Sequence, residues 1–176
     1  MANAREEMRP TVLVTAGSKH GSTTEIARRI ARGLEAGGLA VVESAPAEVA
    51  DPARFDAIVL GSAVYAGHWT SDAMDLARKI GELSPPPPTW LFSSGPVGAP
   101  PKPEEDPVDA SEVTEITTAR DHHVFAGKLD RARLNFAEKA IMVALRAPEG
   151  DFRDWDAIDM WAREIAEALK LQESNR

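Results

Sequence analysis

The sequence repeats one arrangement three times: a short apolar run ends in a loop of small residues, and a segment with helical spacing follows further along the chain. An apolar run bounded in this way is typical of a strand that is buried on both faces. Because strands that alternate with helices form parallel sheets, the pattern predicts an α/β fold with helices on both faces of one sheet. The runs are Val12–Val14, Phe55–Leu60 and Trp90–Phe92, and their loops begin at Gly17, Gly61 and Ser93.

Two weaker strands and five helices complete the expected fold. Leu39–Val42 follows a glycine pair and indicates a strand near an edge, and His122–Gly127 indicates the last core strand. Apolar residues at helical spacing predict helices over 25–34, 72–83, 111–120, 134–145 and 154–171. The 176 residues suit a single domain, 1–176, in which we expect residues 1–10 to be flexible and the Pro- and Glu-rich stretch 99–109 to be mobile.

The first loop has the composition of a phosphate site. It lies between a strand and a helix, where several backbone N–H groups and the positive end of the helix dipole point to one spot. Hydroxyl groups can donate to phosphate oxygens there, and Lys19 or His20 can add positive charge. The loop matches neither Gly-x-Gly-x-x-Gly nor a Walker P-loop, and a loop of this kind can also serve only as a helix cap. Its hydroxyl residues are Ser18, Ser22 and Thr23, and its glycines are Gly17 and Gly21.

Composition excludes several classes of function. The formal net charge of −8 argues against a general nucleic-acid surface and against binding to anionic membranes. The chain has no cysteine, which excludes disulfides, a thiol nucleophile and cysteine-ligated metals, so any redox chemistry requires a cofactor. Neither a signal peptide nor a run of about 20 apolar residues is apparent, so we expect a cytoplasmic protein without an integral membrane segment.

The three small-residue loops should converge on one site. Each follows a strand of the same parallel sheet, and in such sheets ligands bind beyond the carboxyl ends of the strands. His122 and His123 begin a strand without a third ligand at suitable spacing, so we expect no metal site.

These motifs resemble those of flavodoxin-like FMN proteins. The similar segments are VTAGSKHGSTTEIA at 14–27 and FDAIVLGSAVYAGHW at 55–69. Within that family the chain is most similar to the quinone-linked, flavodoxin-like protoporphyrinogen oxidases, through FAGKLDRARLNFAEKAIM and the later DWDAIDMWAREIA. The resemblance implies a doubly wound five-stranded parallel sheet of order 2-1-3-4-5, one noncovalent FMN, and no side chain that is an obligatory acid or base. The implied partner is a redox protein or a small electron donor or acceptor such as a quinone or a porphyrin.

The resemblance also implies which residues bind FMN. The first loop would hold the phosphate, the second would pass beside the isoalloxazine, and the third would line its other side. The implied residues are Ser18, Lys19, His20, Gly21, Ser22 and Thr23, then Ser62, Ala63, Val64, Tyr65, Gly67 and His68, and finally Ser94, Gly95, Pro96 and Val97.

Other interpretations stay open at this point. Tyr65 and Trp69 either stack on the flavin or pack in the fold, and His20 and His68 either contact the ligand or are exposed. The acidic residues between Glu104 and Asp109 form a solvated loop or a docking surface for a basic partner. The whole chain could instead be a binding or regulatory module of the same fold that has lost flavin. A phosphate-transfer enzyme is disfavoured because no Walker lysine or magnesium-binding aspartate accompanies the loop.

Overall fold

The computed structural model describes residues 10–95, 106–144 and 146–174. The strands are β1 (Thr11–Gly17), β2 (Ala40–Glu43), β3 (Ala57–Tyr65), β4 (His68–Trp69), β5 (Thr89–Ser94), β6 (Asp121–Phe125), β7 (Lys128–Leu129) and β8 (Gly150–Asp151). The helices are α1 (Ser22–Ala36), α2 (Ser71–Gly81), α3 (Ala110–Thr117), α4 (Phe136–Ala144) and α5 (Trp155–Ser174). Single 3-10 turns lie at Pro46–Glu48, Pro52–Arg54 and Arg131–Arg133.

Five parallel strands form the central sheet in the order β2-β1-β3-β5-β6. When only these strands are counted, the order is 2-1-3-4-5, as the resemblance to flavodoxin-like proteins implied. The labels differ because the two-residue strand β4 pairs with β3 in an antiparallel hairpin and takes a number of its own. Such a short strand has too little alternating pattern to be recognised from sequence. The predicted helices are all present, with ends shifted by a few residues.

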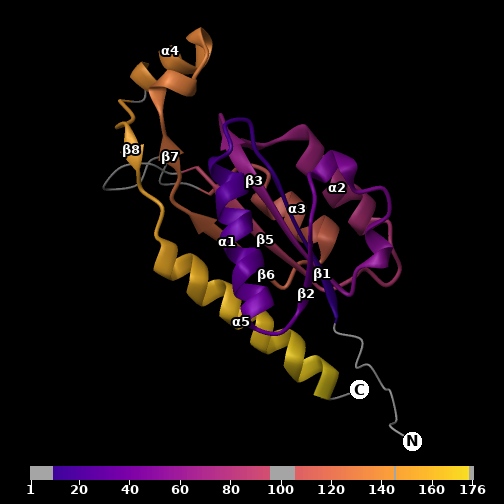
Figure 1. Ribbon diagram of the computed structural model, residues 1–176. Coiled ribbons are helices and arrows are strands. Elements are labelled where there is room, and N and C mark those ends of the chain that lie inside the picture. The colour runs from indigo at the N-terminus through magenta and orange to yellow at the C-terminus, as the bar shows by residue number, and fades with distance from the viewer. Residues whose placement is uncertain (1–9, 96–105, 145, 175–176) are drawn as a thin grey trace, which may run out of the picture.

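The sheet separates two apolar cores. Val12 and Val14 of β1 pack into the core covered by α1 and α5, whereas Leu13 packs into the core covered by α2 and α3. This alternation follows from the period of two residues along a strand. Figure 1 shows α5 running beside α1, with α2 and α3 across the sheet from them. The expectation of helices on both faces is therefore confirmed.

Helices α1 and α5 pack closely because two glycines lie on the shared face, Gly33 within α1 and Gly37 directly after its end. A Cβ on Gly33 would lie 2.7 Å from the Cβ of Ala162, and one on Gly37 would lie 2.8 Å from that of Ala166. These separations are shorter than real Cβ contacts, so the helix spacing requires glycine at both positions.

Between β6 and α5 the chain leaves the sheet and forms a small excursion made of β7, α4 and β8. Strands β7 and β8 pair in an antiparallel ladder, and Leu129 and Ala147 form a separate small core beneath α4. Helix α4 begins with a capping box, in which Asn135 Oδ1 accepts from the Glu138 N–H at 2.9 Å and Glu138 Oε2 accepts from the Asn135 N–H at 3.0 Å. Figure 1 shows this excursion projecting beyond the end of the sheet at which β3 ends. No helix in the described part of the chain is long and apolar enough to cross a membrane.

Candidate functional site

The carboxyl ends of the three central strands lie level with one another. Gly17 of β1 is in register with Ser62 of β3, and Ser62 is in register with Ser93 of β5. The loops that leave these strands therefore start at one edge of the sheet. This edge is where ligands bind in open parallel sheets.

The first loop forms a tight turn that leaves backbone donors available. Ser18 Oγ accepts a hydrogen bond from the Gly21 N–H at 3.1 Å, and Gly21 itself has a φ of +86°, which favours glycine. The first helical bond of α1 runs from the Glu25 N–H to the Gly21 carbonyl oxygen. Among the described residues, no acceptor faces the backbone N–H groups of His20, Ser22, Thr23 and Thr24. The loop thus offers a group of amide donors at the positive end of α1.

The two glycines of this loop have different physical roles. A Cβ on Gly17 would lie 1.8 Å from Thr70 Oγ1, so the protein's own packing requires glycine there. A Cβ on Gly21 would meet only Arg133 Nη1, at 4.0 Å, so the space above this residue is open. Gly21 therefore leaves room for a ligand to approach the backbone, whereas Gly17 makes room for Thr70, which connects β4 to α2.

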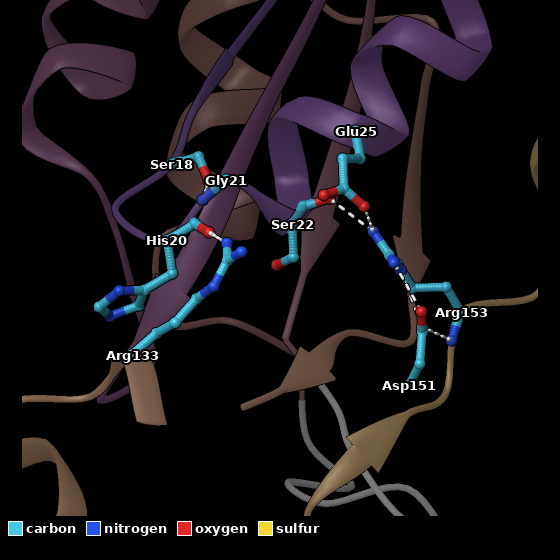
Figure 2. Close-up of polar contacts among 8 residues, drawn as sticks. All are labelled: Ser18, His20, Gly21, Ser22, Glu25, Arg133, Asp151 and Arg153. Carbon is cyan, nitrogen blue, oxygen red and sulfur yellow. Dashed lines mark hydrogen bonds and ion pairs between the residues drawn. The ribbon is translucent and has the colours of Figure 1, made fainter. Parts of the chain in front are cut away.

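Two arginines from the C-terminal part of the chain flank the loop, and the sequence interpretation assigned neither to the site. Figure 2 shows Arg133 reaching the loop at His20, while Arg153 reaches it at Ser22. Arg133 Nη1 donates to the His20 carbonyl oxygen at 3.0 Å. Arg153 Nη1 donates to the Ser22 carbonyl oxygen at 3.2 Å and to Glu25 Oε2 at 2.6 Å.

Arg153 is held far more firmly than Arg133. Its side chain is 3% exposed and also forms a two-pronged pair with Asp151, through distances of 2.8 and 2.6 Å. Its guanidinium lies 4.5 Å from the ring centroid of Trp155. The pair with Asp151 raises the pKa of Arg153 and lowers the pKa of Asp151. Arg153 therefore stays charged and ties the first turn of α1 to β8.

Tyr65 lies against the first loop. Its hydroxyl oxygen accepts from the Lys19 N–H at 3.3 Å, and Lys19 Nζ lies 4.4 Å from its ring centroid. The ring of His20 meets Tyr65 edge to face at 6.1 Å. Burial raises the pKa of Tyr65 above its ordinary value. The structure therefore brings Tyr65, Lys19 and His20 together.

Helix α4 contacts His20 through Glu138, a half-buried acidic residue. Glu138 Oε1 lies 3.3 Å from His20 Nε2. The hydrogen bond from the Asn135 N–H, together with the neighbouring His20, holds the pKa of Glu138 below its usual value. The loop is thus linked to α4 through His20 and Glu138, and to the turn that precedes α4 through Arg133.

The second loop is a hairpin whose residues divide between core and surface. Ser62 and Ala63 are buried in β3, and the Ser62 hydroxyl accepts from the Thr70 N–H at 2.9 Å. The tight turn at Ala66 and Gly67 has φ values of +50° and +85°. His68 is exposed, and Val64, Tyr65 and Gly67 are half-buried. Of the residues expected beside the flavin, these last four therefore have surface that a ligand can reach.

Trp69 is a core residue. It is 5% exposed, packs among the residues covered by α2, and donates from Nε1 to Ser93 Oγ at 2.8 Å. The same hydroxyl lies 2.8 Å from His122 Nε2, and burial lowers the pKa of His122. The surroundings of Trp69 therefore favour a role in packing over stacking on the flavin.

Asp109, the last residue of the acidic stretch that begins at Glu104, is hydrogen bonded to the hairpin of the second loop. Its carboxylate accepts from the Trp69 N–H at 2.8 Å and lies 3.1 Å from His68 Nδ1. The Val108 N–H donates to the Gly67 carbonyl oxygen at 2.8 Å. These two residues of the expected mobile stretch are thus hydrogen bonded to the fold.

The third loop is described only at its start. Ser94 is buried at the end of β5, and a Cβ on Gly95 would lie 3.2 Å from the Cβ of Val64. Pro96 and Val97 lie outside the described residues. The described part places the beginning of this loop beside the second one.

The described residues contain no cluster of three or more His, Asp or Glu side chains suited to a metal ion. Instead, the site combines amide donors, cationic side chains and one half-buried tyrosine. The sequence shows both Arg133 and Arg153, but no spacing rule connects either of them to a loop more than 100 residues earlier.

Comparison with known proteins gives a family and a fold. A family model described as "Flavodoxin domain" matches residues 13–156. A flavodoxin from the domain Archaea aligns with a TM-score of 0.60 and 16% identity over 91% of this chain and 99% of its own. A flavodoxin from Streptococcus pneumoniae TIGR4 aligns with a TM-score of 0.59 and 18% identity over 92% of this chain and 99% of its own.

A larger protein contains the same fold. The rubredoxin oxygen:oxidoreductase from Desulfovibrio gigas aligns with a TM-score of 0.62 and 17% identity over 94% of this chain and 38% of its own. No curated protein matches the sequence at a significant level. At identities this low, the structural likeness establishes the fold alone.

Proposed function

The chain belongs to the flavodoxin domain family, and from this premise we propose that it binds one FMN noncovalently and transfers electrons. The observation that carries the proposal is the group of amide donors at His20, Ser22, Thr23 and Thr24, which face no acceptor among the described residues. A phosphate dianion supplies several acceptor oxygens at once, so its chemistry suits this donor set.

Cationic side chains around the loop favour the same ligand. Lys19 belongs to the loop itself, and Arg133 donates to its His20 carbonyl oxygen at 3.0 Å. In a chain of net charge −8, these cations provide local attraction for an anion. We therefore add Arg133 to the residues that would hold the phosphate, which are Ser18, Lys19, His20, Gly21, Ser22 and Thr23.

The remaining part of the ligand would lie along the same edge of the sheet. Tyr65 offers the aromatic ring nearest the loop, and Val64, Gly67, His68 and Gly95 have backbone or side chains beside it. We propose that these residues orient the cofactor and exclude water from one side of it, and the buried Ser62, Ala63 and Ser94 support them from within the strands. When bound, FMN supplies the electron or hydride chemistry. No side chain need then act as an acid or base.

A finer proposal concerns the substrate. The segments at 125–142 and 154–166 resemble the flavodoxin-like protoporphyrinogen oxidases, which supports a porphyrinogen as electron donor and a quinone as acceptor. The test is oxidation of protoporphyrinogen IX by the FMN-loaded protein with a soluble quinone, followed by porphyrin fluorescence. Quinone-dependent turnover that is lost with Tyr65→Ala supports this substrate class. A rate equal to that of free FMN rejects it and leaves electron transfer to a protein partner.

The primary experiment separates phosphate binding from binding of the flavin ring. FMN and riboflavin are titrated into the apoprotein, and flavin fluorescence reports the dissociation constants. We expect FMN to bind more tightly than riboflavin. Thr23→Val should weaken FMN binding roughly 10- to 100-fold, as expected when one charge-assisted hydrogen bond of about 1.5–3 kcal/mol is lost. Riboflavin binding should not change.

The matched control is Thr114→Val, which removes a hydroxyl bonded to the Ala110 carbonyl oxygen on α3, far along the chain from the loop. Equal affinities for FMN and riboflavin would place the phosphate elsewhere. Failure to bind either flavin would favour the alternative of a binding or regulatory module.

A further inference from the structure

Helices α1 and α5 form a groove at the surface of the molecule. Figure 1 shows the two helices side by side on the same face of the sheet. The groove has a volume of about 430 Å³, and small residues form its floor, which are Gly33, Ala36, Gly37 and Ala166. Because none of these residues has a long side chain that could fill the groove, a bound chain can bring its backbone close to both helices.

An ion pair closes one end of the groove. Arg29 and Asp159 are the first residues that line it from α1 and from α5. Arg29 Nε donates to Asp159 Oδ1 and Arg29 Nη2 donates to Asp159 Oδ2, both at 2.6 Å. These hydrogen bonds lower the pKa of Asp159, and the charge of Arg163 lowers it further. Asp159 is therefore ionised at neutral pH and is already engaged with a cation of the same protein.

The rest of the groove is positively charged. Arg32 lines it from α1, and Arg163, Glu167 and Lys170 line it from α5. All four of these residues are exposed, and three cations with one acid give this part of the groove a formal charge of +2. Within the described part of the chain, none of the three cations forms an ion pair. A chain with 28 acidic and 20 basic residues has acids to spare, so a cluster of unpaired cations stands out from the rest of its surface.

The length of the groove indicates what kind of anion fits it. On α5 the lining residues extend from Asp159 to Lys170, which is about 16 Å at 1.5 Å per helical residue. An extended peptide of about five residues has the same length. Its successive side chains point to opposite sides, so neighbouring acids in it can reach Arg32 on one side of the groove and Arg163 on the other.

We propose that this groove binds a short acidic segment of another protein in extended conformation. The carboxylates of the segment pair with Arg32, Arg163 and Lys170, and its backbone lies over Gly33 and Gly37. The groove begins at Arg29, more than one turn of α1 beyond the phosphate loop. The proposal therefore does not depend on FMN binding.

A nucleic acid fits this groove less well. It carries a negative charge at every nucleotide and would extend past both ends of the groove. Exposed acids at Glu35 and Glu164 lie on the same two helices, and the whole chain has a net charge of −8, so a long polyanion would be repelled outside the groove. A short acidic segment avoids most of this repulsion.

The test is an NMR titration of the whole isotope-labelled protein with a blocked peptide of five glutamates. The matched peptide has five glutamines, and a pentathymidylate serves as the nucleic-acid probe. We expect the glutamate peptide to bind at least about tenfold more tightly than either of them, because several exposed ion pairs add their contributions. Amide shifts should change mainly at 29–37 and 159–170, and added salt should weaken binding.

Two variants probe charge and space separately. Arg32→Gln combined with Arg163→Gln should lower the affinity for the glutamate peptide at least about fivefold, because two ion pairs are lost. Ala36→Leu should lower it by a similar factor, because the larger side chain occupies the floor of the groove without a change of charge. Leucine is also a good helix former, so α1 should stay intact. General attraction of the peptide to the protein surface would not respond to Ala36→Leu.

The matched control is Arg54→Gln combined with Arg78→Gln, which removes two exposed positive charges outside the groove. It should not change peptide binding. Circular dichroism should show the same helix content for all variants.

Several outcomes would overturn the proposal. Equal binding of the glutamate and glutamine peptides, or no binding of either, would show that the cations do not recognise carboxylates. Shift changes outside the two helices, or an equal loss with the control pair, would show that the peptide lies elsewhere. Tighter binding of the pentathymidylate would assign the groove to a nucleic acid. Self-association that the Arg32 and Arg163 pair abolishes, without peptide binding, would assign it to a second copy of this chain.

Discussion

Arg133 adds a cation to a loop whose other donors are backbone amides and hydroxyls. Its side chain is 59% exposed, so the charge acts through solvent as well as through direct contact. An exposed cation of this kind contributes modestly, in contrast to a buried one. Its effect should therefore appear in affinity for the phosphate, with little effect on the stability of the fold.

Arg133→Gln should weaken FMN binding about three- to tenfold, in line with about 1 kcal/mol for an exposed charge pair. Riboflavin binding should stay constant, and the salt dependence of FMN affinity should decrease. Fluorescence titrations at two salt concentrations provide the measurement. Arg163→Gln, on the exposed face of α5, is the control. If the two variants behave alike, Arg133 does not contact the phosphate.

The residues of the first loop were predictable because their types carry their chemistry. Serine, threonine and glycine after a strand indicate a turn with free donors, and the structure contains that turn at Ser18 and Gly21. The reason for Gly17 was not predictable, since its neighbour Thr70 belongs to another loop. Arg133 and Arg153 were missed for the same reason, because contacts between distant segments leave no local pattern.

Arg153 joins three elements of the fold, α1, β8 and α5. Its buried guanidinium bonds the Ser22 carbonyl oxygen and Glu25 in the first turn of α1, bonds Asp151 in β8, and lies over Trp155 at the start of α5. It thereby fixes the position of the helix end that faces the candidate phosphate site. We regard Arg153 as a positioning residue for that site.

Arg153→Met should lower the free energy of unfolding at pH 7 by about 1–3 kcal/mol, less than for a fully buried pair because its two acids are partly exposed. The pKa of Asp151 is lowered by Arg153, so this stabilisation is complete above the ordinary value of 3.8 and is lost as pH falls through the folded-state value. The difference between wild type and variant should therefore shrink below pH 3.8. Urea unfolding at several pH values measures it.

The control for this prediction is Arg78→Met, which breaks an exposed pair between Arg78 and Asp75 on α2. It should cost no more than about 0.5 kcal/mol. A variant of Arg153 as stable as this control would show that the buried cluster does not hold α1 in place.

The central elements could be predicted because each combines length with a clear period. The buried strands are near-continuous apolar runs, and α1, α2 and α5 repeat apolar residues at helical spacing. The outward face of α4 could not be predicted, because its apolar pattern resembles that of a core helix. Only the tertiary arrangement shows that Glu138 faces inward and Phe136 outward.

For the whole molecule, one sheet serves two cores. Residues on both faces of β1 and β3 are buried, so neither core can be lost without exposing the other face of the same strands. The excursion with α4 has only a small core of its own, centred on Leu129 and Ala147. The sheet and its four covering helices should therefore unfold as one cooperative unit. Helix α4 should open separately and at a lower free energy.

We expect a single thermal transition in near- and far-ultraviolet circular dichroism, because the two cores share the sheet. Amides of α4 should exchange with deuterium well before those of β1, β3 and β5, because α4 can open locally. Hydrogen exchange followed by mass spectrometry resolves these segments. Two separated transitions, or equal protection of α4 and β3, would contradict a single domain with a weakly held excursion.

The visible absorption spectrum of the purified protein, recorded after incubation with FMN and exhaustive dialysis, shows directly whether the chain holds a flavin. We expect retained flavin absorption at one FMN per chain, because amide donors and nearby cations hold its phosphate while the flavin supplies the chemistry. The same procedure with riboflavin should leave little or no bound flavin. A spectrum without flavin after FMN treatment would rule out FMN as the ligand and show that the loop at the start of α1 serves another ligand or none.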